Sequence, residues 1–420
     1  MTESAPVNAL RPPRAAAFGF IFATALMNAV SFGIMIPILP NLIKQMVGGD
    51  TASASEWNVL FATTWGAMQF LIGPVLGMLS DRYGRRPVLL ISIFGLCVDF
   101  LFMAFAPTLA WLYAGRILNG MTASSFSTAN AYVADITPPD RRARNFGMMG
   151  SAFGFGFVIG PSLGGVLGEI SLRLPFMVAA GLCLVNGIYG LLVLPESLAP
   201  ERRTASMNWR RANPLGALAF LREHGELLSL AAVGFLFQLA QVVLPTIFVL
   251  YTGYRYGWTP AILGFTFMAT GAAMIVVQMF FVGPLVKRVG ERGAVLVGAG
   301  VGALGFVIYA LAPSGLIYLM AIPVFAAMGF LQPGLLGLMS RRAGPTHQGQ
   351  LQGANQSLQG IASILGPPLF GLTFAWSIRH EASLHLPGLA ILVAAGLLGL
   401  AFLISLRVAR PLAASAPAVA

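Results

Sequence analysis

Charged residues are scarce in this chain. Asp, Glu, Lys and Arg make up only 9% of its 420 residues, whereas 57% are hydrophobic. Soluble domains carry about 25% charged residues, so a water-soluble fold would have too few polar groups to cover its surface. Lipid as the surrounding solvent removes this difficulty. The composition therefore excludes an ordinary soluble protein and predicts an integral membrane protein with the lipid bilayer as its partner.

Cysteine and histidine are also rare, with two and four residues. Cys97 and Cys183 both lie inside apolar runs, where they provide neither a disulfide framework nor a metal-ligand spacing. The sequence contains no HExxH, no nucleophile elbow and no GxxxxGK[ST] phosphate loop. We therefore expect no enzymatic activity, no ATP-driven pumping, no metal and no cofactor.

Long apolar runs are abundant instead. A bilayer core of about 30 Å requires roughly 20 apolar residues per helix. Twelve runs of this kind can be recognised: 17–39, 57–79, 87–106, 108–133, 146–168, 174–195, 227–251, 259–282, 293–312, 315–339, 350–374 and 385–407. The shortest connections between neighbouring runs lie at Pro107 and at residues 312–314, and we call these the closest cuts. The pattern predicts an all-α integral membrane protein with twelve transmembrane helices.

Basic residues outnumber acidic ones, 25 to 14, which gives a formal net charge of +11. Nucleic-acid binders share this surplus, but in a membrane protein it usually reflects Lys and Arg in cytoplasmic loops. With the N-terminus in the cytoplasm, only Lys44, Arg173, Arg255 and Arg379 fall on the opposite side, and Arg116 lies within a run. The other twenty basic residues then lie on the cytoplasmic side. This asymmetry predicts two cytoplasmic termini and no nucleic-acid partner.

The longest hydrophilic stretch is 196–226, which contains several Arg residues together with Pro200 and Pro214. It divides the runs into two sets of six. We therefore expect an N-terminal six-helix bundle over residues 1–195, a cytoplasmic linker with a short surface helix over 196–226, and a C-terminal six-helix bundle over 227–420.

An internal repeat supports this division. The basic hairpin at residues 77–89, between the second and third runs, returns in degraded form 206 positions later at residues 283–292. The same offset relates other pairs: Gly160-Pro161-Ser162-Leu163-Gly164-Gly165 with Gly366-Pro367-Pro368-Leu369-Phe370-Gly371, Pro139 with Pro345, and Gly147 with Gly353. Two parallel six-helix halves with a substrate site between them are typical of transporters built from repeats.

Three motifs allow a family to be named: Gly77-x3-Asp81-Arg82-x-Gly84-Arg85-Arg86, Arg116-x3-Gly120 and Gly156-x3-Gly160-Pro161-x2-Gly164-Gly165. Over about residues 16–405 the chain resembles the major facilitator superfamily. Further segments are similar to its tetracycline-efflux-like drug:proton antiporters: Ser31-Phe32-Gly33-x3-Pro37-x-Leu39-Pro40, Leu194-Pro195-Glu196-Ser197 and Gln350-Leu351-Gln352-Gly353.

This resemblance implies a fold and a function. The fold is two pseudo-symmetric six-helix bundles in a bacterial inner membrane, and we expect the protein to act as a monomer. The function is export of an amphipathic small molecule or drug, tetracycline-like or multidrug, by proton antiport with alternating access.

The resemblance also identifies gating residues. They are Gly77, Asp81, Arg82, Gly84, Arg85 and Arg86 in the hairpin, and Gly160, Pro161 and Gly164 in the fifth run, where ordinary helix packing is the alternative explanation. Gly77 would allow close helix packing, and Gly84 a tight turn with positive φ. A carboxylate at Asp81 is favoured near a helix N-terminus by about 0.3–1 kcal/mol. The family implies that Asp81 bridges the two halves at the eleventh helix and stabilises the outward-facing state. Topology alone explains Arg85 and Arg86 equally well.

Asp99 and Arg116 are the charges deepest in the predicted membrane region, where each costs roughly 2.5–3.5 kcal/mol on insertion scales. In one interpretation Asp99 takes and releases a proton and Arg116 tunes it. In the other, the two form a permanent structural ion pair. Asp135, near the inner end of the fourth run, is the third candidate for a proton-coupling or charge role. We expect it to be a gate partner for a loop arginine.

Polar and aromatic residues within the runs form a candidate substrate pocket of neutral, partly aromatic character, as cavities for amphipathic drugs have. Its members are Asn28, Trp65, Asn119, Phe235, Gln238, Gln241, Met274, Gln332 and Asn355. Each of them could instead make an interhelical hydrogen bond.

The chain departs from characterised tetracycline antiporters at three positions. Those proteins carry an acid, a histidine and an aspartate where this chain has Asn28, Met274 and Gly302. The alternative function is therefore a facilitator or importer of an unrelated metabolite that is not driven by protons.

Overall fold

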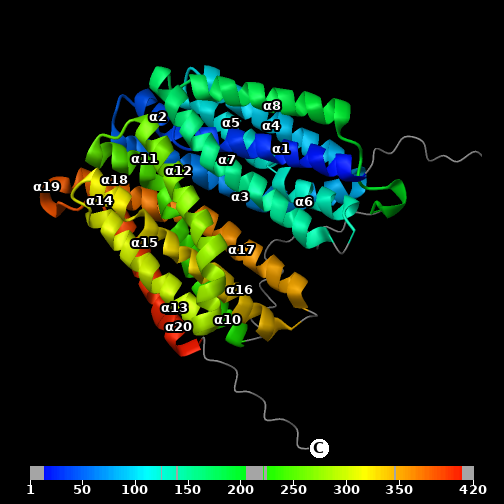
Figure 1. The fold of residues 1–420 in the computed structure, drawn as a ribbon. Helices are drawn as coiled ribbons and strands as arrows, with labels where there is room; N and C mark the ends of the chain where they lie inside the picture. The colour runs from blue at the N-terminus through cyan, green and yellow to red at the C-terminus, as the bar shows by residue number, and fades with distance from the viewer. Residues whose placement is uncertain are drawn as a thin grey trace, which may run out of the picture. The chain divides into compact units, whose positions relative to one another are not determined.

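The computed structural model describes residues 14–123, 125–138, 141–204, 221, 225–344 and 347–408. Every regular element within these ranges is a helix (Figure 1). The first half of the chain forms the following elements: α1 (Arg14–Met35), α2 (Leu39–Met46), α3 (Thr51–Tyr83), α4 (Arg85–Phe105), α5 (Leu109–Thr122), α6 (Ser125–Ile136), α7 (Arg142–Ile170), α8 (Leu174–Val193) and the 3-10 turn η2 (Pro200–Arg202).

The second half contains more interrupted helices. Its elements are α10 (Gly225–Gln241), α11 (Val243–Tyr256), α12 (Pro260–Val276), η4 (Val277–Phe281), α13 (Val282–Leu311), α14 (Gly315–Met320), α15 (Ile322–Ala326), η5 (Ala327–Phe330), α16 (Leu331–Ala343), α17 (Gln348–Pro367), η7 (Pro368–Leu372), α18 (Thr373–Arg379), α19 (Glu381–Leu384) and α20 (Leu389–Val408). The π-turns η4 and η7 interrupt long helices, and such turns are frequent at functional sites.

Ten helical stretches in the described residues are long and apolar enough to cross a membrane. The difference from twelve has two local causes. One stretch, Pro260–Leu311, has 52 residues, about 78 Å at 1.5 Å per residue, and it turns at Gly290 (φ 73°, ψ 174°). It therefore holds two of the predicted spans.

The other cause lies in the fourth predicted span. It divides into α5, of 14 residues, and α6, of 12 residues, and Ala123 at the end of α5 leaves the helical region (φ −73°, ψ 74°). Each piece alone is shorter than the roughly 20 residues that a bilayer core requires. With these two adjustments the described helices accommodate the twelve predicted spans. The two closest cuts are confirmed, because α4 ends at Phe105 before α5 and α13 ends at Leu311 before α14.

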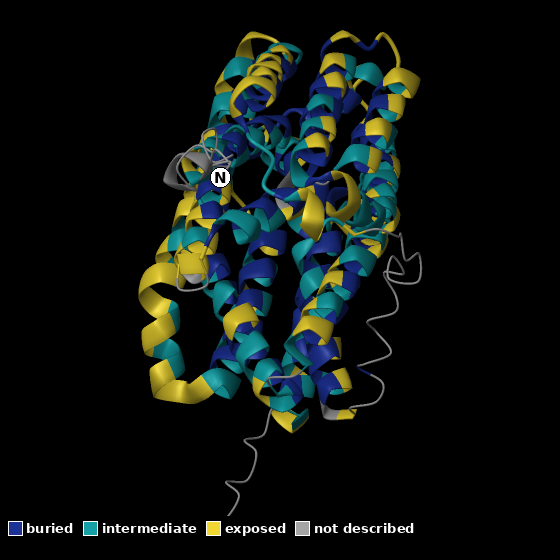
Figure 2. Cartoon of the chain, turned by 90° about the vertical axis from the view of Figure 1, so that its right-hand side faces the viewer, coloured by how far each residue is buried: buried dark blue, intermediate teal, exposed yellow. Residues whose placement is uncertain are grey.

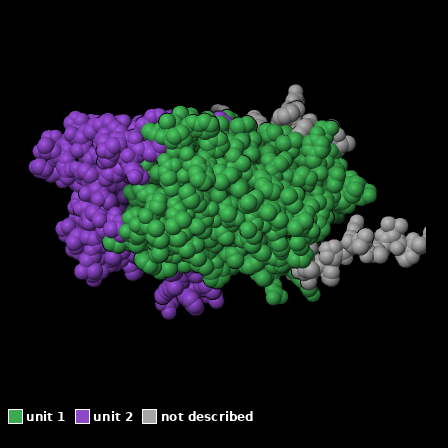
Figure 3. All heavy atoms as spheres, turned by 90° about the horizontal axis from the view of Figure 1, so that it is seen from above, with its two compact units in different colours: residues 1–42, 71–212, 260–268 green, residues 43–70, 213–259, 269–420 purple. Residues whose placement is uncertain are grey.

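The chain forms two compact units (Figure 3). Unit 1 comprises residues 1–42, 71–212 and 260–268, and unit 2 comprises residues 43–70, 213–259 and 269–420. The start of α3 therefore belongs to unit 2 and the start of α12 to unit 1. The surface helix expected in the linker lies largely outside the described residues, which omit 205–220 and 222–224.

Helix pairing repeats within the units. In unit 1, α1 packs against α6, α7 and α8, and α4 packs against α5 and α8. In unit 2, α10 packs against α16, α17 and α20, and α13 packs against α16 and α20. When the predicted spans are numbered along the chain, each of these helices in unit 1 corresponds to the helix six spans later in unit 2, and corresponding pairs pack together. The repeat found in the sequence is thus also a repeat of packing.

Each unit has its own apolar core, and buried and exposed residues share the same helices (Figure 2). In unit 1, Tyr132, Leu89 and Ile93 belong to one buried cluster. In unit 2, the rings of Tyr309 and Tyr318 stack with centroids 4.0 Å apart. Many large apolar side chains are exposed, among them Leu192 and Phe280. Exposed apolar surface of this extent is what a lipid-facing helix presents.

Candidate functional site

A buried ion pair joins α4 to α5 in unit 1. Asp99 is 0% and Arg116 4% exposed. The guanidinium of Arg116 contacts both carboxylate oxygens: its Nε lies 3.3 Å from Oδ1, and its terminal nitrogen bonds Oδ2. The contact thus has the two-pronged geometry that makes Arg–carboxylate pairs strong.

Small residues bring the two helices close enough for this pair. A Cβ on Gly115 would lie 3.0 Å from Asp99 Oδ1 and 2.9 Å from Phe102 Cβ, and a Cβ on Gly95 would overlap the side chain of Thr122. Phe102 and Trp111 stack at a centroid distance of 5.5 Å. The carboxylate is therefore enclosed by packed side chains, and its charge is balanced by Arg116.

In this arrangement the charge on Asp99 decides whether the buried guanidinium of Arg116 has a counter-charge. While Asp99 is ionised, the two charges neutralise each other. Protonation of Asp99 would leave the guanidinium buried without a counter-charge, and breaking a buried pair in this way costs about 3–5 kcal/mol. A proton can therefore be held at Asp99 only if Arg116 gains another acceptor or reaches water.

A second network surrounds the hairpin between α3 and α4. Arg85 bonds Asp81 and Ser80, and its Nε donates to Asp135 Oδ2 at 3.0 Å. Ser197 Oγ donates to the same oxygen of Asp135 at 3.2 Å. The side chain of Asp81 is 51% exposed, whereas those of Arg85 and Asp135 are 13% and 16% exposed. Arg85 therefore ties the end of α3 to α6.

Two glycines of the hairpin differ in what they do. Gly84 has a φ of 112°, as the expected tight turn requires. Gly77 does not provide the close packing expected of it, since a Cβ there would meet nothing within 4 Å in the described part of the chain. Arg82 stacks over the ring of Tyr83, and Arg86 bonds the carbonyl of Leu191.

The glycines of α7 form a contact face toward α1. Cβ atoms on Gly160 and Gly156 would lie 2.7 Å from Gly33 Cα and 2.8 Å from Val30 N, and one on Gly164 would overlap the carbonyl of Ile34. Pro161 lies inside α7 without ending it. These glycines allow two helix backbones to approach as closely as small residues permit in membranes.

Sequence reasoning did not find a contact made by the Thr51 end of α3 within unit 2. Ser55 Oγ donates to the carbonyl of Gly371 at 2.8 Å, and Asn58 Nδ2 donates to the carbonyl of Thr246 at 2.8 Å, both buried. A Cβ on Gly371 would overlap Val59. We call this contact of α3 with α11 and η7 the α3 seam.

The half-exposed residues Glu56 and Arg379 form an ion pair beside the α3 seam. The only signal in the sequence was that Arg379 is one of four basic residues assigned to the sparsely charged side.

A related contact joins α7 to the start of α12 within unit 1. A Cβ on Gly165 would overlap the carbonyl of Pro260 and lie 3.2 Å from Ala261 Cα, and Ala261 N donates to Glu169 Oε1 at 2.9 Å. We call this contact the α12 seam. Ala261 lies 206 positions after Ser55, and Gly371 lies 206 positions after Gly165. The two seams therefore bring together equivalent positions of the repeat.

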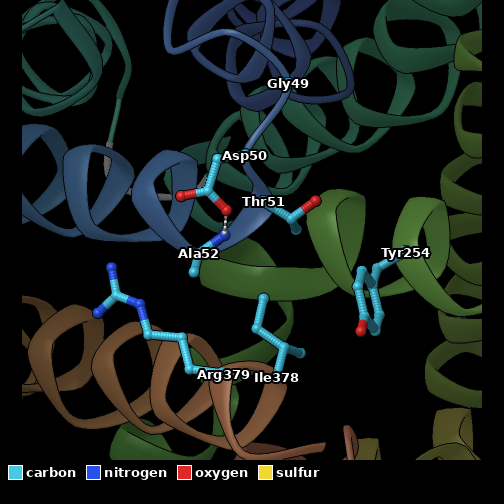
Figure 4. Close-up of a pocket in the computed structure, with 7 residues that line it drawn as sticks. All are labelled: Gly49, Asp50, Thr51, Ala52, Tyr254, Ile378 and Arg379. Atoms are coloured by element: carbon cyan, nitrogen blue, oxygen red, sulfur yellow. Dashed lines mark hydrogen bonds between the residues drawn. The ribbon is translucent and has the colours of Figure 1, made fainter.

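A cavity of about 370 Å³ lies beside the α3 seam (Figure 4). Its walls include Asp50, Tyr254 and Arg379. Asp50 accepts hydrogen bonds from the N–H groups of Ala52 and Ser53, each at 3.1 Å. The Ser53 side chain and these backbone groups lower the pKa of Asp50. Two other polar side chains of the cavity are also engaged, because Tyr254 bonds Glu381 and Arg379 pairs with Glu56.

The predicted substrate residues are divided between the units. Asn28 and Asn119 belong to unit 1, and the other seven belong to unit 2: Trp65, Phe235, Gln238, Gln241, Met274, Gln332 and Asn355. Asn119 is buried and Gln332 is exposed, while the rest are half-buried. Asn28 Oδ1 and Asn355 Nδ2 are buried atoms with no hydrogen-bond partner among the residues that the structure describes.

Comparison with known proteins places the chain in a family. The family model described as Major Facilitator Superfamily matches residues 21–367. The chain belongs to the Major Facilitator Superfamily. It is 40% identical to the class C tetracycline resistance protein of Escherichia coli, covering 85% of this chain and 89% of that protein. It is 26% identical to multidrug resistance protein 2 of Bacillus subtilis (strain 168), covering 86% and 90%.

Solved structures agree on the fold of the superfamily. The nucleoside transporter NupG has a TM-score of 0.75 at 14% identity and covers 94% of this chain and all of that one. The human organic anion transporter MFSD10 has a TM-score of 0.67 at 23% identity, with the same coverage. The expected all-α membrane fold is confirmed. So is the expectation of a multi-pass membrane protein that is similar to tetracycline resistance proteins.

Proposed function

We propose that this chain exports an amphipathic drug, tetracycline or a wider range of compounds, in exchange for protons that bind at Asp99. The observation that carries the proposal is the Asp99–Arg116 pair, a carboxylate and a guanidinium buried inside the membrane region. Ionisable residues at this depth are rare and usually serve ion or substrate pathways. Tetracycline enters as a candidate because of the resistance proteins to which the chain is similar.

In the proposed cycle, Asp99 and Arg116 are paired while no proton is bound. A proton from outside neutralises Asp99 and frees Arg116, which then contacts another polar group or water. Because the freed charge is unfavourable in the packed state, the helices rearrange until it is solvated or paired again. Release of the proton to the cytoplasm restores the pair. Each turn would then couple inward proton movement to outward drug movement.

The proposed transport direction goes with one orientation of the chain in the membrane. With both termini in the cytoplasm of a bacterial cell, the hairpin between α3 and α4 is cytoplasmic, and the α3 and α12 seams lie at the outer face of the inner membrane. The two seams then act as the closed outer gate of alternating access, and the hairpin network as part of the inner gate. We propose that a single chain carries out the whole cycle.

A drug-susceptibility panel in an efflux-deficient host, with and without an uncoupler, tests this proposal. Cells that express the protein should accumulate less drug, the uncoupler should abolish the difference, and Asp99→Asn should behave like the uncoupler. Normal pumping by the Asp99→Asn variant would exclude Asp99 as the proton carrier.

The alternative function is a facilitator that does not use protons, and the relatives do not favour it. Its single support is the loss of titratable side chains at Asn28, Met274 and Gly302. Reconstituted protein that transports its substrate equally well without a pH gradient would establish it.

A further inference from the structure

One carboxylate from the end of α8 lies on the first turn of α4. Glu196 Oε1 accepts a hydrogen bond from the N–H of Arg85 at 2.8 Å, and Oε2 accepts one from the N–H of Arg86 at 3.3 Å. These N–H groups belong to the first turn of a helix, which has no intrahelical partners for them. The positive end of the helix dipole also favours an anion there. Glu196 thus supplies the cap that the residue before the helix, Gly84, cannot supply.

The same carboxylate shapes its own segment. Glu196 Oε1 also accepts hydrogen bonds from the N–H groups of Ser197 and Leu198, each at 3.0 Å. The side chain of Glu196 therefore accepts four backbone hydrogen bonds, two from the hairpin and two from the residues that directly follow Glu196. Its position is fixed relative to both segments.

Gly84 is fitted to this carboxylate. Its backbone, with φ 112° and ψ 161°, lies in a region that is essentially restricted to glycine. A Cβ there would overlap Glu196 Oε2 and lie 2.7 Å from Glu196 Cδ. The absent side chain at Gly84 therefore leaves the space that Glu196 fills, although the two residues are 112 positions apart in the sequence.

The chain around Glu196 makes two further contacts, one with α6 and one with the hairpin. Tyr132 on α6 donates to the carbonyl of Pro195 at 2.8 Å. After η2 the chain returns to the hairpin, where the N–H of Thr204 donates to the carbonyl of Asp81 at 3.1 Å. The segment from Pro195 to Thr204 thus binds the hairpin at both ends and begins the connection to the second half of the protein.

We propose that Glu196 is a positioning residue for the hairpin between α3 and α4. It holds the start of α4 in place, and thereby fixes where Arg85 meets Asp81 and Asp135. Asp81 is itself partly exposed, and its bond to Arg85 is what connects its side chain to this framework. This inference rests on the proposed gating role of the hairpin.

The test combines two measurements on the full-length protein. Hydrogen exchange at the amides of Arg85 and Arg86 should become about tenfold faster in Glu196→Ala, as expected when a local hydrogen bond is lost. The maximal rate of tetracycline transport in inverted vesicles should fall about tenfold, the loss expected for a charge-assisted hydrogen bond, with the KM unchanged. Glu196→Gln keeps one acceptor and should lie in between, which separates positioning from misfolding.

Glu201 provides a matched control, because it is an exposed acid on η2 in the same segment. Glu201→Gln should leave the exchange and the rate as they are. Asp81→Asn in the same assay separates the two claims. If Asp81→Asn transports normally, the gating role of the hairpin is wrong. If Asp81→Asn is impaired while Glu196→Ala shows parental exchange or a parental rate, the positioning role is wrong and the gating role stands.

Discussion

Gly371→Ala is a sharp test of the α3 seam as the outer gate. The added methyl group would overlap Val59 Cγ2, with Thr246 Cγ2 at 3.4 Å and Ser55 Oγ at 3.5 Å on its other sides. The methyl group therefore has no free space to move into. Overpacking of this kind costs about 1–3 kcal/mol. Since the cost falls only on the conformation in which the seam is closed, the population should shift away from it by roughly 5–150-fold.

Accessibility of a cysteine at the seam measures this shift. Thr246 is 4% exposed and lies within the seam, so Thr246→Cys, with Cys97 and Cys183 replaced by Ala, reports seam opening. An impermeant maleimide applied to intact cells should label it slowly in the parent, and faster in Gly371→Ala by the factor above.

Val59→Ala provides the decisive control, because it removes the atom that the new methyl group would overlap. The double variant Gly371→Ala/Val59→Ala should return to slow labelling. Fast labelling that persists in the double variant would refute the reasoning from this contact. Labelling of Gly371→Ala at the parental rate would show that the seam is not closed as described.

Two further perturbations follow from the structure. Arg116→Ala should lower the free energy of unfolding by about 3–5 kcal/mol, because it leaves Asp99 buried without a partner. Adding Asp99→Asn to this variant should recover part of the loss. Thermal unfolding of the two single variants and the double variant checks this, and additive effects would contradict a direct pair. Asp50→Ala should destabilise the start of α3 by about 1 kcal/mol through loss of its N-cap. The folded-state pKa of Asp50 is lowered, so its contribution to stability should be present at neutral pH and disappear as the pH falls below that pKa. The stabilities of the parent and the variant should therefore converge in acid. A constant difference at every pH would contradict the cap.

The sequence predicted most of the fold because lipid imposes a simple rule. Each span must satisfy its own backbone hydrogen bonds and present apolar side chains, so length and composition suffice to locate it. The cuts at Pro107 and at residues 312–314 were found in this way. The break after α5 was not, because nothing in the apolar pattern marks Ala123 as a point where helical dihedrals end.

The candidate site was predictable only in part. Asp99 and Arg116 were identified from their cost in a membrane, and their helices are adjacent in the sequence. The partnership of Glu196 with Gly84, and that of Ser55 with Gly371, could not be anticipated. Each depends on which face of a helix meets which neighbour, and the polar residues of a long apolar helix do not reveal its rotation. The 206-residue offset contained a usable signal, since it relates the positions that meet in the two seams.

The two seams occupy equivalent places in the repeat but use different chemistry. The α3 seam has an ion pair of half-exposed side chains, Glu56 and Arg379, whereas in the α12 seam the carboxylate of Glu169 receives a backbone N–H. Dissolved ions weaken attraction between exposed charges far more than a hydrogen bond to the backbone. Salt in the surrounding medium should therefore weaken the ion pair beside the α3 seam and leave the hydrogen bonds of both seams largely unchanged. Duplication gave the protein two matching contacts, and divergence placed a pair of salt-sensitive charges beside one of them.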